Sequence, residues 1–125
     1  MTYRKENQIE ETDKRILEVL KDTDKHDIMK ALRAWKIHLE KNLLFPFDAV
    51  IFEEQEEDPL KAGDRVSVLR IDDSDDLYGL LAEIRFGRRK YYFPLCDLEV
   101  TKKRSPNYQP VSDYCVWFVN RDRYD

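Results

Sequence analysis

The hydrophobic pattern of this chain changes its period at Pro46, and this change constrains the fold more than any other feature. Before it, Ile28, Leu32, Trp35 and Leu39 recur at steps of three and four residues, which indicates an amphipathic helix. After it, apolar and polar residues alternate, as in strands that bury one face. Proline cannot continue a helix, because its ring clashes with the preceding turn. The sequence therefore predicts helices first and a sheet second.

Two helices are predicted before the change of period, at residues 12–20 and 24–42. We expect them to form a hairpin across residues 21–25, with Thr23 or Asp24 as the N-cap of the second helix. Residues 1–12 are polar and have no sustained period, so a frayed tail is predicted there.

Five short strands are predicted after the helices, at residues 47–52, 64–71, 78–86, 90–93 and 97–101. In the third strand, Phe86 falls on the apolar face that we expect to be buried. Closely spaced antiparallel strands of this length favour a small barrel of the SH3-like kind. Residues 104–110 are rich in turn formers. Residues 111–120 after them are predicted to be a helix, although their β-branched and aromatic content also suits a strand.

The predicted fold class is α+β: an N-terminal helical hairpin packed on a small five-stranded antiparallel SH3-like barrel, with a short C-terminal helix. A length of 125 residues suits a single domain, with a helical part, a barrel and a C-terminal segment at residues 1–44, 45–104 and 105–125. The longest apolar run, residues 114–119, is too short to span a bilayer, and residues 1–10 do not have the pattern of a signal peptide. We expect a cytoplasmic protein that does not associate with membranes.

Residue types that carry much of enzyme chemistry are scarce in this chain. His26 and His38 are its two histidines, and Cys96 and Cys115 are nineteen positions apart, so the ligand spacing of a zinc site is missing. We interpret each cysteine as a small buried apolar residue. The three glycines are scattered, which excludes a glycine-rich phosphate loop. The sequence therefore predicts a protein that is not an enzyme.

Acidic residues are concentrated in the middle of the chain. Residues 45–80 contain eleven Asp and Glu against three Lys and Arg, a net charge of −8, whereas the whole chain carries −4. Two runs, residues 53–58 and 72–76, are predicted to be loops at opposite ends of the second strand, so two sites fit better than one. Carboxylates this close repel one another, and a divalent cation relieves that repulsion. A solvated acidic surface is the alternative interpretation.

Calcium suits such loops better than magnesium, because it accepts six to eight oxygen ligands in loose geometry. An EF-hand aligned from Asp72 fails, since Leu77 stands where the turn requires glycine and Glu83 lies in a predicted strand. The first set of candidate ligands is Asp72, Asp73, Asp75 and Asp76. The second set is Glu53, Glu54, Glu56, Glu57 and Asp58, with Asp64 as a helper.

A basic and aromatic hairpin supports a different function. Arg85, Arg88, Arg89, Lys90 and Tyr91 could hold phosphates and stack bases, or bind a protein. The neighbouring acidic region gives an unfavourable field for nucleic acid, which argues against that partner. This interaction module is the alternative to a calcium-binding function.

Several blocks of the sequence resemble the CcbP-type calcium-binding proteins of cyanobacteria. The blocks are Phe45-Pro-Phe-Asp-Ala-Val50, Asp76-Leu-Tyr-Gly79, Tyr92-Phe-Pro-Leu-Cys-Asp-Leu-Glu-Val100, Ser105-Pro-Asn-Tyr-Gln109 and Asp113-Tyr-Cys-Val-Trp-Phe-Val-Asn-Arg121. The resemblance covers residues 35–121 and implies Ca²⁺ binding through a negatively charged surface that lowers free Ca²⁺ in the cell. These blocks are mostly core and turn positions, so the acidic candidates rest on the present sequence alone. We expect an intracellular calcium buffer or sensor with a dissociation constant of roughly micromolar or weaker.

Overall fold

The structure is a computed structural model that describes residues 2–24, 26–56, 59–75 and 77–124, with the backbone alone for residues 2–10. Its elements in chain order are α1 (Thr2–Leu20), α2 (Ile28–Asn42), β1 (Phe47–Ile51), β2 (Arg65–Asp75), β3 (Gly79–Phe86), β4 (Arg89–Pro94), the 3-10 helix η1 (Leu95–Asp97), β5 (Leu98–Val100), α3 (Tyr108–Val119) and the 3-10 helix η2 (Arg121–Tyr124). The predicted α+β class is therefore confirmed. In the part of the chain described, no helix is long and apolar enough to cross a membrane.

The five strands form one antiparallel sheet in the order β4-β3-β2-β1-β5. Two register shifts occur along the pairing of β2 with β3, between Val68 and Arg70 and between Ile71 and Ser74. Such irregularities increase the local bend and twist of a strand. Among the described residues, no strand pairing joins the edge strands β4 and β5, so the predicted barrel is open rather than closed.

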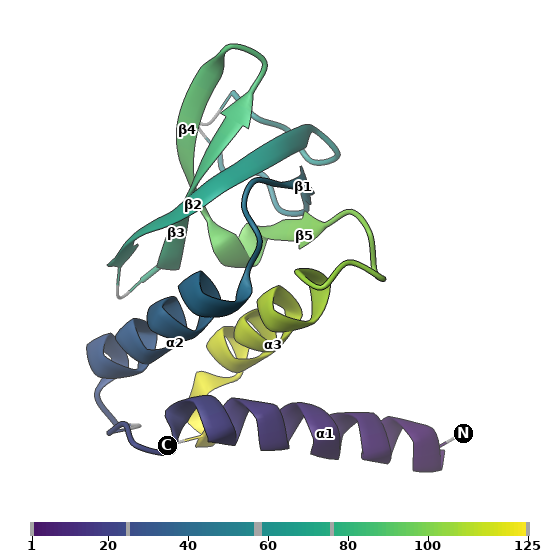
Figure 1. The fold of residues 1–125 in the computed structure, drawn as a ribbon, viewed down its shortest axis with the longest axis vertical. Helices are drawn as coiled ribbons and strands as arrows, with labels where there is room; N and C mark the ends of the chain where they lie inside the picture. Colours follow the sequence, from purple (N-terminus) through teal and green to yellow (C-terminus); the bar gives the residue numbers. More distant parts are fainter. Residues whose placement is uncertain (1, 25, 57–58, 76, 125) are drawn as a thin grey trace.

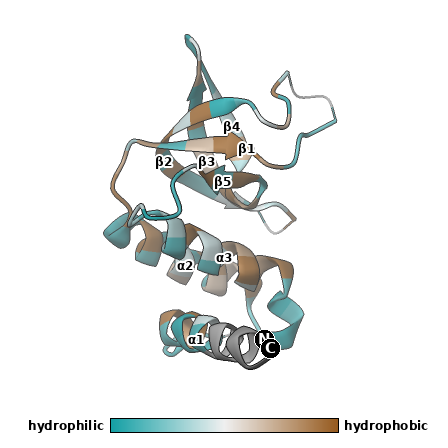
Figure 2. Ribbon diagram, turned by 90° about the vertical axis from the view of Figure 1, so that its right-hand side faces the viewer, coloured by the Kyte–Doolittle hydropathy of each residue, from teal (hydrophilic) through white to brown (hydrophobic). Residues whose placement is uncertain are grey.

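The helices form two layers on one side of the sheet. Figure 1 and Figure 2 show α2 and α3 next to the strands, and α1 crossing beneath both helices on the side away from the sheet. Trp35 of α2 contacts Tyr114 and Trp117 of α3, with ring centroids 5.7 and 5.8 Å apart. All three side chains are buried. This aromatic group therefore joins α2 to α3 within the layer that lies next to the sheet.

The structure corrects two predictions about the N-terminal helices. The predicted frayed tail is helical, since α1 already begins at Thr2. Its first turns are rich in Lys, Arg, Glu and Gln, which have high helix propensity without needing an apolar stripe. The N-cap of α2 is Asp27 rather than Thr23 or Asp24, because the Asp27 carboxylate accepts the N–H groups of Met29 and Lys30.

The strand predictions hold for all five elements, with one important change of boundary. β2 continues to Asp75, so the described residues of the second acidic run, Asp72, Asp73 and Asp75, belong to a strand and not to a loop. Phe86 is 38% exposed instead of buried, because it sits beside the Gly87 turn, past the edge of the core. The helix predicted near the C-terminus is present as α3.

Candidate metal-binding site

Two acidic segments lie at opposite ends of β2, as predicted. We call Glu53, Glu54, Glu56, Glu57 and Asp58, which lie between β1 and β2, the acidic loop. We call Asp72, Asp73 and Asp75 at the end of β2, together with Asp76 that follows them in the sequence, the acidic strand end. In Figure 1 one end of β2 lies beside α2, while the other points away from the helices. Among these candidate ligands Glu57, Asp58 and Asp76 lie outside the described residues.

Asp72 is already neutralised by basic neighbours. Its Oδ1 lies 2.6 Å from Nη1 of Arg70, and the charge of Lys36 on α2 also acts on it. Partial desolvation works to raise the pKa of Asp72, but the Asp73 backbone N–H and Arg70 outweigh it and lower that pKa. Arg70 also pairs with Glu83 on β3, at 2.9 Å. Asp72 would have to give up this pairing in order to bind a cation with its full charge.

Asp73 and Asp75 each use one carboxylate oxygen for the local backbone. Oδ1 of Asp75 accepts the N–H groups of Leu77 and Tyr78 at 2.7 and 3.0 Å, which fixes the turn into β3. Oδ1 of Asp73 accepts the N–H of Ser74 at 2.8 Å. Within the described part of the chain, Oδ2 of both residues makes no hydrogen bond or ion pair. These two oxygens are therefore available for a cation.

A side chain of α3 supports the start of β3, directly after these carboxylates. Oη of the buried Tyr114 accepts the Leu80 N–H at 2.7 Å. Gly79 has a φ of +75°, and a Cβ there would lie 2.4 Å from the same Oη. Glycine is thus required by both its backbone conformation and the close approach of the tyrosine. Burial raises the pKa of Tyr114, so its hydroxyl stays protonated at neutral pH.

The acidic loop is closed at its base by backbone hydrogen bonds. The Ile51 N–H donates to the Asp64 carbonyl at 2.9 Å, and the Gly63 N–H donates to the Ile51 carbonyl at 2.8 Å. The Asp64 carboxylate accepts the Lys61 N–H at 2.8 Å, so this predicted helper stabilises the turn before β2. Glu54 pairs with Lys61 at 3.5 Å. Glu53 and Glu56 are exposed and face solvent.

Asp97, which no pattern in the sequence marked as a site residue, lies against the acidic loop. Its carbonyl accepts the N–H groups of Phe52 and Glu53, and its carboxylate accepts Nε2 of Gln55 at 2.5 Å. Burial, reinforced by the charge of Glu53, raises the pKa of Asp97. The signal that could have found it is topological. In a sheet where β1 pairs with β5, the residue before β5 lies beside the residue after β1.

Neither acidic segment forms a complete metal-coordination site among the described residues. Across the residues that the structure describes, no three His, Cys, Asp or Glu side chains come together closely enough to hold a metal ion. The arrangement instead offers exposed or half-buried carboxylates on short backbone segments that are anchored by hydrogen bonds. A large, flexible cation such as Ca²⁺ tolerates this geometry, whereas Mg²⁺ demands a near-ideal octahedron.

The basic hairpin offers less of a binding surface than its sequence indicated. Tyr91 packs against the core, so its ring is not a free stacking platform, and Lys90 lies 3.6 Å from Glu83. Arg88 and Arg89 are exposed at the tip, beside the turn between β3 and β4. Arg85 lines a separate polar cavity of about 570 Å³.

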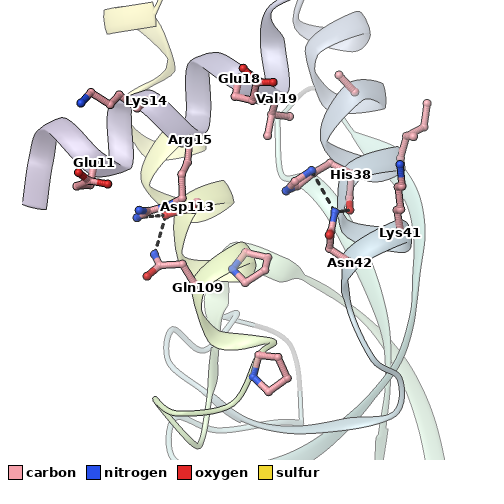
Figure 3. Close-up of a pocket in the computed structure, with 14 residues that line it drawn as sticks. Glu11, Lys14, Arg15, Glu18, Val19, His38, Lys41, Asn42, Gln109 and Asp113 are labelled. Carbon is pink, nitrogen blue, oxygen red and sulfur yellow. Dashed lines mark hydrogen bonds and ion pairs between the residues drawn. The ribbon is translucent and has the colours of Figure 1, made fainter.

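A larger cavity, of about 870 Å³, lies among the three helices (Figure 3). Its one buried carboxylate, Asp113, is saturated by Arg15 at 2.7 and 3.1 Å and by Gln109 at 2.8 Å. His38, on the opposite wall, has a pKa lowered chiefly by burial and is hydrogen-bonded to Asn42 at 3.3 Å. Asp113 is therefore not a free calcium ligand, and the other two carboxylates that line the cavity, Glu11 and Glu18, are exposed.

Solved structures and a family of known sequences resemble this chain. A calcium-binding protein in its calcium-binding form matches with a TM-score of 0.69 and 20% identity over 89% of this chain and 91% of that one. The crystal structure of Anabaena CcbP matches with a TM-score of 0.70 and 22% identity over 87% and 89%. No curated protein matches. The model of the CcbP family, described as calcium binding, matches residues 6–118. The chain therefore belongs to the CcbP calcium-binding family.

Proposed function

We propose that this protein binds Ca²⁺ reversibly at the two ends of β2 and acts as a calcium buffer or sensor in the cytoplasm. The observation that carries the proposal is the family match over residues 6–118. The fold supports it, since it presents two separate groups of exposed or half-buried carboxylates on a molecule whose middle segment carries a charge of −8. We expect no catalytic activity.

We assign the first site to the acidic strand end. Asp73 and Asp75 provide the Oδ2 oxygens, and Asp76 is the next residue in the sequence. Asp72 contributes its charge from beside the site while it remains paired with Arg70. Backbone carbonyls and water complete the six to eight oxygens that Ca²⁺ requires.

We assign the second site to the acidic loop. Glu53 and Glu56 are exposed, and Glu54 pairs with Lys61 at 3.5 Å and accepts the Ala62 N–H at 3.3 Å. Glu57 and Asp58 complete the set. Asp64 keeps the base of the loop closed. Binding at either site has to order carboxylates that are not already gathered, and this cost lowers affinity. We therefore expect dissociation constants of roughly micromolar or weaker.

Calorimetry with Ca²⁺ at moderate salt tests the proposal. A saturable heat is expected, and millimolar Mg²⁺ should displace little of the bound Ca²⁺. Absence of saturable heat would overturn the calcium function, and equal competition by Mg²⁺ would reduce it to general counterion attraction.

An amide-shift map during the titration locates the sites. Two variants of equal charge change separate them: Asp73, Asp75 and Asp76 replaced by Asn, and Glu53, Glu54 and Glu56 replaced by Gln. Each should remove the shifts at its own end of β2 and leave the other end unchanged. If neither variant alters the shifts, the assigned carboxylates are not the ligands.

A further inference from the structure

The two cysteines meet across the contact between η1 and α3, although they are nineteen positions apart in the sequence. The Cys96 thiol donates to the Cys115 carbonyl at 3.8 Å, and the Cys115 thiol donates to the Leu95 carbonyl at 3.9 Å. Each thiol therefore points at the backbone of the segment that carries the other cysteine. The two sulfurs have to approach to the bonding distance of about 2.05 Å for a disulfide to form.

The thiol pair is reachable from solvent. Both cysteines are half-buried, and both line a cavity of about 200 Å³ together with Phe52, Leu98 and Val111. The walls are mostly apolar and the volume is small. An oxidant of the size of hydrogen peroxide therefore fits, whereas a bulky one meets a narrow site.

We propose that Cys96 and Cys115 form a redox-active pair that hydrogen peroxide converts into an intramolecular disulfide. The Cys96 thiolate attacks one peroxide oxygen, the O–O bond breaks, and Cys96 becomes a sulfenic acid while the released hydroxide takes up a proton. The Cys115 sulfur then attacks the Cys96 sulfur, the S–O bond breaks, and the proton of Cys115 leaves with hydroxide as water. In total the two thiols lose two electrons and the peroxide is reduced to two molecules of water.

The order of these steps follows from the surroundings of the two sulfurs. The interaction with the Cys96 thiol, together with burial, raises the pKa of the Cys115 thiol. Because the thiolate is the reactive form, Cys115 is the poorer first nucleophile. Cys96 therefore reacts first, and Cys115 resolves the intermediate.

Closure of the disulfide also reaches the acidic loop. Cys96 directly precedes Asp97, whose carbonyl and carboxylate hold Phe52, Glu53 and Gln55. A movement of η1 toward α3 therefore displaces Asp97 and, through its hydrogen bonds, the residues at the start of this loop. The disulfide itself does not depend on calcium binding.

Intact-mass measurement and peptide mapping of the wild-type protein after peroxide treatment test the proposal. We expect the loss of two hydrogen atoms, a peptide linked through Cys96 and Cys115, disappearance of both free thiols, and full reversal by dithiothreitol. A monomer that keeps both thiols, or that gains oxygen atoms without a link, would refute the pair. A dimer linked between two chains would do so as well.

Two single substitutions give matched controls. Cys115→Ser should trap the sulfenic acid on Cys96, which dimedone labels, while Cys96→Ser should leave Cys115 far less reactive. Amide shifts at residues 52–56 should accompany oxidation of the wild type and be absent in Cys115→Ser. A disulfide that forms without those shifts would refute the link to the acidic loop.

Discussion

Tyr114 connects the helical layer to the acidic strand end through a single hydroxyl. We expect Tyr114→Phe to lower the free energy of unfolding by about 1–3 kcal/mol, because the buried Leu80 N–H then lacks an acceptor. Urea unfolding measures the change. Tyr92→Phe is the matched control, since the Tyr92 side chain is 56% exposed, and its effect should stay within about 0.5 kcal/mol. Equal stability of the Tyr114→Phe variant and wild type would show that this hydrogen bond does not fix the turn.

Asp97 makes the stability of the protein depend on pH. Its pKa is raised in the folded state by burial and by Glu53, so the folded protein holds this proton more tightly than the unfolded chain. The stabilising effect of protonation is therefore lost as the pH rises from about 4 through the folded pKa. Without calcium, Asp97→Asn should be more stable than wild type at pH 7, and the difference should shrink as the pH falls toward about 4.

Denaturant midpoints at several pH values measure this difference. Asp48→Asn removes an exposed carboxylate on β1 and serves as the control for the change in charge. A difference for Asp97→Asn that grows as the pH falls would have the wrong sign for a raised pKa.

At the scale of elements, calcium binding at the sites proposed on β2 should stabilise the fold. A ligand that binds only the native state stabilises it by RT ln(1 + [L]/Kd), about 2.7 kcal/mol at a hundredfold excess over Kd. For a domain near this size, Ca²⁺ should raise the melting temperature by several degrees. Replacing Asp73, Asp75 and Asp76 with Asn should remove much of the rise. Asparagine at position 75 can still accept the N–H groups of the turn through its side-chain oxygen.

Without Ca²⁺ this triple variant should be at least as stable as wild type, because three mutually repelling charges are gone while the Asp72–Arg70 pair remains. Thermal unfolding with and without Ca²⁺ provides both comparisons. If the variant keeps the full rise, the acidic loop is the main site. If wild type shows no rise at saturating Ca²⁺, both acidic segments are only solvated surface.

The sequence predicted the elements well, because each was signalled by local periodicity. Helical spacing before Pro46 and alternation after it are present as α2 and as the five strands. The extension of β2 to Asp75 was not predictable in this way, since aspartate is disfavoured in strands. Pairing of Ser74 with Leu80 and of Asp75 with Gly79 overrides that preference.

The parts of the site that the sequence left hidden all depend on contacts between distant segments. Asp97 reaches the acidic loop only because β5 pairs with β1, and Cys96 meets Cys115 only because η1 packs on α3. Arg70 pairs with Glu83 across neighbouring strands. The spacing of residues along the sequence does not indicate such contacts between distant segments.

At the scale of the whole molecule, Arg15 connects the outer helix α1 to α3, which lies next to the sheet. It donates two hydrogen bonds to the carboxylate of Asp113, which is only 5% exposed. Arg15→Gln should lower the free energy of unfolding by about 1–3 kcal/mol, since the buried carboxylate keeps only Gln109 as a partner. Lys14→Gln, at an exposed neighbouring position, should change stability by less than about 0.5 kcal/mol. Chemical denaturation of both variants makes the comparison, and equal effects would mean that Asp113 does not need Arg15.

The length of β2 decides how the protein would respond to a rising calcium concentration. The seven residue steps of β2 from Arg65 to Asp72, at about 3.3 Å each, hold the two acidic segments roughly 23 Å apart, more than twice the Debye length of about 8 Å in physiological salt. An ion at one end therefore has almost no electrostatic influence on the other end. Occupancy should climb gradually, with a Hill coefficient not above one in equilibrium titrations. Such a molecule evens out fluctuations in concentration and lacks the sharp threshold of a cooperative trigger.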